Sequence, residues 1–273
     1  MPLGFAKSTF TYGSAAAAGS DVGWWTQAGA VDAGNQVCQK VVLGSNQTHS
    51  DFVFSCWFRA DSSNDFDSHF DAFELFKLGQ GDNNSGAFII EFHKNNGIQV
   101  MLFGMDGGGG GTNFSTGNLS GTFNSTYVDG EWHHLLAQGI FSNTSKAKIF
   151  LDGVDKTTNT LGSTAALVGS FHMGTNMSFG GRANGEVNKE FGGDLTQAYV
   201  DLGSSTDYTS SLTKFYDSGY VDMGTDGTGS SADAPEVFLY VNSTPAVVNG
   251  GSTGTLSLST SNTMTVNATG GPS

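Results

Sequence analysis

The segment Asp51–Ala60 reads DFVFSCWFRA, and its apolar side chains recur with period two. Successive side chains of a β-strand point to opposite faces, so one face of this segment carries F-F-C-F and the other carries V-S-W. Both sets are largely apolar, which is typical of a strand that is covered on both sides. We therefore expect residues 51–60 to form a central strand.

The same pattern continues on both sides of this strand, in short runs separated by Gly, Asn, Asp and Ser clusters. The clearest runs are residues 36–43, 51–60, 72–78, 87–93, 98–103, 133–141, 147–151, 178–180, 193–201 and 236–242. The pairs Asn96-Gly97 and Asp152-Gly153 lie at the ends of such runs and suit tight hairpin turns. The pattern predicts an all-β, two-sheet antiparallel sandwich of about ten to fourteen strands.

The composition excludes several classes of protein. The 273 residues include 40 Gly but only 4 Pro, so the glycine belongs to turns and not to a collagen repeat or a disordered Pro/Gly tract. Lys and Arg number 11 against 25 Asp and Glu, the net charge is −14, and the arginines are Arg59 and Arg182. Nucleic-acid binding is therefore not expected.

The sequence shows neither a membrane-spanning run nor the pattern of a signal peptide. No run approaches the ~18 apolar residues of a membrane span, and the N-terminal stretch lacks the charged and apolar parts of a signal peptide. We expect a chain made without its own export signal and not inserted in a membrane.

Cys38 and Cys56 lie in alternating apolar segments. They are interpreted as small buried side chains, with a bridge between neighbouring strands as the alternative.

Composition shifts divide the chain into three parts. Residues 1–36 are predicted to form an N-terminal arm, residues 37–203 the strand-and-turn domain, and residues 204–273 a connection followed by a C-terminal β arm. The last part has too little apolar content to fold alone, so we expect it to pack on the domain or on neighbouring subunits. Within it, helical spacing of apolar residues predicts a single short helix or turn at residues 210–218.

A resemblance to a known family rests on four segments in order. Residues 127–137 read YVDGEWHHLLA and residues 148–153 read KIFLDG, while residues 52–58 and 191–200 supply an aromatic strand and a closing strand. Together they resemble laminin-G-like, concanavalin-A-like lectin domains. The resemblance implies a jelly-roll sandwich in which Trp132 packs and His133 and His134 form hydrogen bonds. It does not fix the function, because that fold carries lectins, hydrolases, adhesion modules and structural proteins.

The C-terminal part shows a narrower resemblance. Residues 221–227, 235–240 and 249–256 are similar to the end of laminin-G-like proteins encoded by bacteriophages and prophages. This implies a non-enzymatic virion structural protein, for capsid decoration, a head fibre or the tail, made in the host cytoplasm. Its partners would be other copies of itself and other virion proteins. The alternative is a glycan-binding module for host-surface attachment, with or without Ca²⁺; glycan hydrolysis is a third possibility.

Catalytic motifs are not found in the sequence. Retaining glycosidases need two carboxyl groups about 5–5.5 Å apart, and no Glu-x-Asp-x-Glu array is present. Glu91 and the segment 194–201 come nearest but lack the partner carboxylate. Neither a Gly-x-Ser-x-Gly elbow nor a His-Glu-x-x-His pair occurs. We therefore expect the protein not to be an enzyme.

The densest polar cluster follows the aromatic strand, at residues 61–71. In an extended conformation, alternate residues of this loop would share one face, and oxygen-rich clusters of this kind suit Ca²⁺. The candidate ligands are Asp65, Asp67, His69 and Asp71. A solvated acidic loop without a metal is the alternative.

Other candidates for ligand binding lie in the predicted loops and arms. Trp24 and Trp25 are expected either to stack on sugar rings or to fasten the arm to a neighbouring chain. A second rim candidate, also compatible with a plain turn, is the run Asp82, Asn83 and Asn84. The five glycines of residues 107–111 precede no helical pattern, so they suit a loop or a close backbone approach and not a phosphate cradle.

Overall fold

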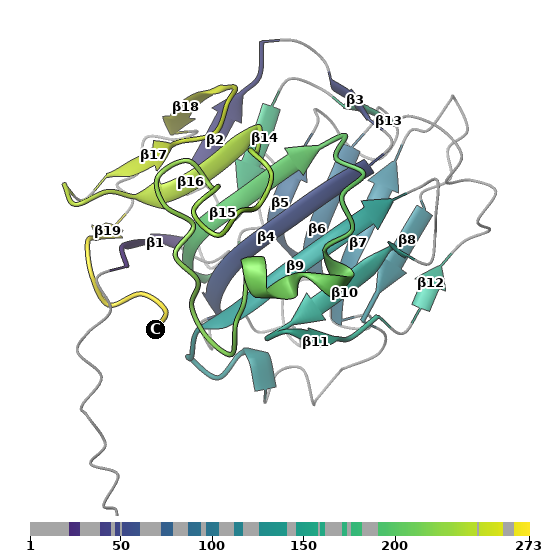
Figure 1. Cartoon of the computed structure of the whole chain (residues 1–273), viewed down its shortest axis with the longest axis horizontal. Helices are drawn as coiled ribbons and strands as arrows, with labels where there is room; N and C mark the ends of the chain where they lie inside the picture. The colour runs from purple at the N-terminus through teal and green to yellow at the C-terminus, as the bar shows by residue number, and fades with distance from the viewer. Residues whose placement is uncertain are drawn as a thin grey trace, which may run out of the picture.

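The computed structural model describes most of the chain. The described residues are 22–27, 39–44, 47–49, 51–60, 72–78, 87–93, 97–103, 112–116, 126–140, 146–157, 159–161, 171–173, 176–181, 191–244, 246–258 and 265–273. Within them the protein is an all-β sandwich of two large antiparallel sheets, called sheet A and sheet B here (Figure 1). The predicted fold class is confirmed. No helix in these ranges has the length and apolar character needed to cross a bilayer.

Sheet A contains the central strand β4. From edge to edge it runs β11 (Val154–Asp155), β10 (Lys148–Leu151), β9 (His133–Ile140), β4 (Asp51–Ala60), β15 (Gly193–Leu202), β1 (Trp24–Gln27) and β19 (Thr265–Asn267). Off this path, β16 (Val237–Val241) pairs with β15 and with β17 (Val247–Asn249). β4 lies between β9 and β15, as its two apolar faces predict.

Sheet B packs against sheet A. Its order is β12 (Asn159–Leu161), β8 (Thr112–Ser115), β7 (Gly97–Phe103), β6 (Ala87–His93), β5 (Ala72–Leu78), β14 (Asn176–Phe179), β2 (Gln39–Val42) and β18 (Thr255–Leu258). A separate pair joins β3 (Gln47–His49) to β13 (Phe171–Met173). The space between the sheets is filled by aromatic and aliphatic side chains, with Phe54 packing on Phe76 and Phe58 on Phe92.

Cys56 lies in this core, 2% exposed and without a disulfide bond in the described structure. Burial raises the pKa of its thiol, which keeps it protonated. Its interpretation as a small buried side chain is confirmed. Cys38 lies outside the described residues.

Residues 204–235 cross the outer face of sheet A, and we call them the cover segment (Figure 1, in green). Tyr208 and Phe215 of this segment pack with Val53 of β4 and Tyr199 of β15 in a second apolar cluster. The second face of β4 is therefore buried as well. Residues 210–218, for which a single short helix or turn is predicted, contain the 3₁₀ turn Leu212–Lys214, and a second 3₁₀ turn, Tyr208–Ser210, ends at the start of this range.

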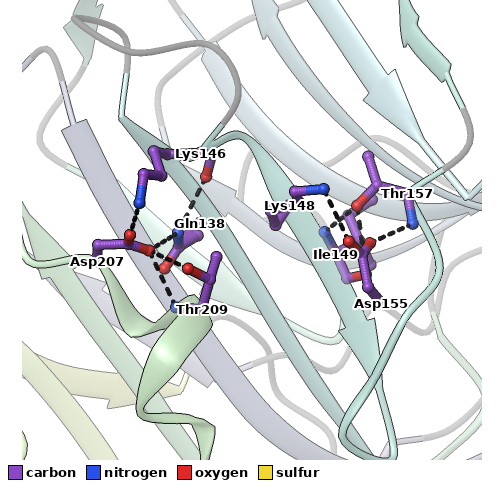
Figure 2. A network of polar contacts seen from close by, with 8 residues as sticks. All are labelled: Gln138, Lys146, Lys148, Ile149, Asp155, Thr157, Asp207 and Thr209. Atoms are coloured by element: carbon purple, nitrogen blue, oxygen red, sulfur yellow. Dashed lines mark hydrogen bonds and ion pairs between the residues drawn. The ribbon is translucent and has the colours of Figure 1, made fainter.

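A polar network fixes the start of the cover segment to sheet A (Figure 2). The Asp207 carboxylate accepts hydrogen bonds from the Thr209 backbone N–H and from Gln138 Nε2, and it pairs with Lys146 Nζ. The Gln138 side-chain oxygen in turn accepts from the Tyr208 backbone N–H at 3.0 Å. Asp207 thus caps the start of the first 3₁₀ turn.

Both ends of the cover segment meet at the end of β15. Glu236, where the segment returns, accepts a hydrogen bond from the backbone N–H of Leu202 at 2.6 Å. Asp201, which precedes the segment, is 5% exposed. Burial, followed by the charge of Glu236, raises the pKa of Asp201 to about 6. The ionised form of Asp201 is therefore unfavourable in the folded protein.

We expect Asp201→Asn to stabilise the protein at neutral pH. A carboxyl group whose pKa is raised on folding contributes stability at low pH and loses it as the pH rises from about 4 through about 6. The variant should match the natural chain near pH 4 and exceed it by about 1–2 kcal/mol at pH 7. Urea unfolding between pH 4 and 7 measures this, with exposed Asp217→Asn as the control. A difference that stays constant over that range would contradict the prediction.

The C-terminal strands pair with strands of the same chain. β16 pairs with β15, β18 with β2, and β19 with β1, whose Trp24 lies opposite Asn267. The described part of residues 204–273 thus lies on the sandwich itself, and β1 is a strand of sheet A.

Candidate functional site

Sheet A divides beside β15, because this strand changes its partner. β1 pairs with residues 193–195 of β15, whereas β16 pairs with residues 198–200. The register of β15 against β4 shifts between Thr196 and Tyr199, and Gln197 has a φ of 47°. A positive φ is uncommon for a residue other than glycine, and bulges of this kind redirect side chains. The result is a fork in the sheet at residues 196–197.

A pocket of about 700 Å³ opens at this fork. Its walls come from segments far apart in the sequence: the start of β1, the bulge of β15, the cover segment, the end of β16 and the C-terminal residues 272–273. The polar and aromatic lining includes Thr196, Gln197, Tyr220, Asp222, Tyr240 and Asn242. We call this site the fork pocket.

Hydrogen bonds within the fork pocket fix several of these groups. Gln197 Nε2 donates to the Tyr220 hydroxyl at 2.5 Å, and Thr196 Oγ1 donates to the backbone oxygen of Gly23 at 2.6 Å. Burial, together with the charge of Asp222, raises the pKa of Tyr220, so its hydroxyl stays protonated. Because that oxygen accepts from Gln197, its own hydrogen is directed away from Gln197.

Two further groups of the pocket suit contact with an organic ligand. The ring of Tyr240 is half-buried and stacks on Phe238 at a centroid distance of 5.7 Å. The side-chain oxygen of Asn242 is buried and has no hydrogen-bond partner among the described residues. A supported aromatic ring and an unsatisfied acceptor are both arrangements that a bound polar ligand would complete.

The structure separates the two tryptophans of the predicted sugar-binding pair. Trp25 is completely buried in the core between the sheets, so a role in stacking on sugars does not fit its position. Trp24 is half-buried, and its Nε1 donates to the backbone oxygen of Thr269 at 3.0 Å. The Arg59 guanidinium lies 4.9 Å from the Trp24 ring and 5.0 Å from the Trp132 ring. Trp24 therefore belongs to a packed cation–π cluster within its own chain.

The other predicted ligand residues lie outside the described residues. These are the proposed Ca²⁺ ligands Asp65, Asp67, His69 and Asp71, the rim run Asp82, Asn83 and Asn84, and the glycines of residues 107–111. The Ca²⁺ site stays a prediction. Among the described residues, no cluster of His, Cys, Asp and Glu could hold a metal ion.

The two histidines have the hydrogen-bonding roles predicted for them. His133 bridges two turns, with Nε2 3.0 Å from Asp129 Oδ1 and Nδ1 2.8 Å from Asp152 Oδ2. Burial alone would lower the pKa of His133, but these hydrogen bonds outweigh it and raise the pKa. His134 Nε2 lies 2.8 Å from Ser55 Oγ, and burial lowers the pKa of His134 to about 3, so it stays neutral.

Sheet B supplies a carboxylate neighbour that the sequence does not reveal. Glu91 of β6 lies directly opposite Glu74 of β5 and also opposite Gln99 of β7, whose side chain donates to Glu91. Both glutamates are buried. The statement that Glu91 lacks a partner carboxylate is therefore wrong for the folded chain, because residues opposite one another in a ladder come close regardless of their separation in sequence.

The residues of the fork pocket were not predicted as a site. Asp222 and Tyr240 fall in the C-terminal stretches that resemble phage proteins, which is the one signal that pointed to this region. Gln197 lies in the closing strand, residues 191–200, and neither it nor Asn242 belongs to a motif that marks a ligand site. Their convergence depends on strand pairing between segments separated by tens of residues, which no local pattern specifies.

The chain is similar in fold to several solved structures. A heptameric pentraxin resembling serum amyloid P from Limulus polyphemus has a TM-score of 0.51 at 9% identity, covering 90% of this chain and 95% of that one. A candidate carbohydrate-binding protein from Bacteroides ovatus has a TM-score of 0.50 at 12% identity, over 93% of this chain and 61% of that one. Domains LG4-5 of the mouse laminin α1 chain have a TM-score of 0.44 at 13% identity, covering 65% of this chain.

The chain spans 42% of the length of that laminin fragment. No curated protein sequence matches it closely. A family model does match residues 32–201, more than half of the chain, and it describes domains built on the sandwich found here. The sequence motifs, the two-sheet architecture and this match agree, and the chain belongs to the concanavalin A-like lectin/glucanases superfamily as a laminin-G-like domain.

Proposed function

We propose that this protein is a carbohydrate-binding module and that the fork pocket is its binding site. One observation carries the proposal: the pocket combines a supported tyrosine ring with a buried acceptor that has no partner in the described structure. Sugars present apolar ring faces and many hydroxyl groups, so they match aromatic surfaces flanked by hydrogen-bonding side chains. The similarity in fold to a candidate carbohydrate-binding protein is consistent with this function.

The walls of the fork pocket are held in place before a ligand binds. Its walls come from sheet A and from the cover segment, which the Asp207 network and Glu236 fix to that sheet. A preformed site loses less conformational freedom when a ligand binds than a flexible loop does. The lining is therefore organised before the ligand arrives.

The test is a glycan array followed by calorimetry with the saccharide that binds best. Tyr240→Ala should weaken binding about tenfold, equivalent to about 1.4 kcal/mol, because it removes the exposed ring face. Val154→Ala, at an exposed position on β11 that does not line the pocket, should leave the affinity unchanged. Full affinity in Tyr240→Ala would exclude the fork pocket as the site. If a chelator abolished binding by the natural chain and by Tyr240→Ala alike, the predicted Ca²⁺ loop would be indicated instead.

We also propose that the module is a non-enzymatic structural component of a bacteriophage virion, with other copies of itself and other virion proteins as partners. The support is the resemblance of residues 221–227 and 235–240 to phage proteins, together with the contribution of the same stretches to the fork pocket. Mass spectrometry of purified phage particles should find the protein at many copies per particle. Absence of the protein from the particles, when it is present in the lysate, would contradict this role. Release of reducing sugar from a polysaccharide by the purified protein, abolished by Glu91→Gln, would contradict the non-enzymatic character.

A further inference from the structure

We propose that the fork pocket selects uncharged, hydroxyl-rich saccharides over acidic ones, and that Asn242 orients the ligand by accepting a hydrogen bond from a ligand hydroxyl. This inference rests on the proposed function of the pocket and adds the class of ligand and a residue that determines specificity.

The first argument concerns the side-chain oxygen of Asn242. Asn242 lines the pocket, whereas this oxygen atom is itself buried and has no partner in the described part of the chain. The residue itself is held in place, since its backbone N–H donates to the backbone oxygen of Ala246 at 3.1 Å after the end of β16. A buried acceptor without a partner destabilises the free protein. A turn of the Asn242 side chain toward the pocket lets a ligand hydroxyl donate to this oxygen and removes the penalty, so the pocket favours a donor at this point.

The second argument concerns charge. None of the described lining residues is Lys, Arg or His, and Asp222 is the one carboxylate side chain among them. Asp222 Oδ1 accepts from the backbone N–H of Gly224 at 2.8 Å, which fixes the carboxylate at the rim. Two basic side chains outside the lining have partners of their own: Arg59 pairs with Asp194, and Lys214 donates to the backbone oxygen of Ser231. A carboxylated or sulfated sugar would meet a negative charge with no cation to offset it.

The third argument concerns the balance of donors and acceptors. The Tyr220 hydroxyl accepts from Gln197, so its hydrogen can be donated to a ligand oxygen. Asn242 and Asp222 supply acceptors. A hydroxyl group both donates and accepts, and a saccharide therefore satisfies all three groups at once.

The pocket also lies mostly outside the family's common core. The family match ends at residue 201, whereas Tyr220, Asp222, Tyr240 and Asn242 all follow it. The specificity argued here therefore comes mainly from segments that follow the residues matched by the family model.

The experiment compares three sets of oligosaccharides on one array: neutral, acidic (uronic, sialylated or sulfated) and amino sugars with free amines. We expect neutral saccharides to bind at least tenfold more tightly than acidic ones of equal length. Asn242→Ala should reduce neutral binding about tenfold, and Asp222→Lys should shift the preference toward acidic saccharides. Thr244→Ala and Asp217→Lys, at exposed positions that do not line the pocket, are the matched controls.

Four other results of this experiment would contradict the proposal in different ways. Acidic saccharides that bind as tightly as neutral ones would overturn the selectivity while leaving carbohydrate binding intact. Preference for free amines, abolished by Asp222→Asn, would replace hydroxyl recognition with recognition of a cation. Unchanged affinity in Asn242→Ala would remove this residue from the site. Absence of binding to every set would overturn the proposed function and this inference together.

Discussion

Gly193→Ala should lower the free energy of unfolding by about 3–5 kcal/mol. Gly193 begins β15, pairs with Ala60 of β4, and has a φ of 141°. A Cβ atom there would lie 2.1 Å from the backbone oxygen of Arg59 and 3.1 Å from the Ala60 Cα. Backbone atoms of a central strand cannot move away as a flexible side chain can, so the pairing of β4 with β15 must distort.

Urea unfolding followed by tryptophan fluorescence measures the loss. Gly44→Ala is the matched control, because a Cβ atom there has no neighbour within 4 Å and Gly44 is not among the positive-φ glycines. It should change stability by less than about 0.5 kcal/mol. If both variants unfold at the same urea concentration as the natural chain, the close approach of β4 to β15 at this position is wrong.

Phe58→Ala should cost about 3–5 kcal/mol of stability. Phe58 is completely buried, and its ring contacts Phe92 of sheet B edge-on at a centroid distance of 5.2 Å. It also lies 6.4 Å from the ring of Phe191. Removal of the ring leaves a cavity between the two sheets, and close-packed strands on both sides restrict its collapse.

Two further variants of the core make this result specific. Phe58→Leu keeps most of the apolar volume and should cost clearly less than the alanine variant. Val154→Ala removes a side chain that is 52% exposed and should be close to neutral. Equal losses in the alanine and leucine variants would show that ring geometry, and not cavity formation, dominates at this position.

The sheet architecture could be predicted from period-two patterns, because side chains alternate between the two faces of a strand and the apolar positions show which faces are buried. Residues 51–60, 72–78 and 87–93 were predicted with the bounds that the structure shows. The helical spacing at residues 210–218 predicts a single short helix or turn, and the structure has the 3₁₀ turn Leu212–Lys214 there, with a second turn, Tyr208–Ser210, before Ser211. Apolar residues of this region pack on sheet A. Spacing reports which side chains are buried, but hydrogen bonds such as those of Asp207 decide the backbone conformation.

The fork pocket could not be predicted in the same way. Its position follows from β15 exchanging β1 for β16 at a bulge, and both partners are distant in sequence. Similarly, Glu74 and Glu91 become neighbours only through the pairing of β5 with β6. The charge of −14 argues against nucleic acid as a ligand, but it could not show that the described pocket lining itself lacks basic residues.

The pairing of β1 with β19 has a mechanical consequence. Val22 accepts a hydrogen bond from the backbone N–H of Gly271, and Trp24 lies opposite Asn267, so both ends of the described chain leave sheet A at the same corner. A force that pulls these ends apart acts across the strand pair, not along it. The hydrogen bonds would then break one after another, as in a zipper, and β19 would detach while the sandwich between β4 and sheet B remained folded.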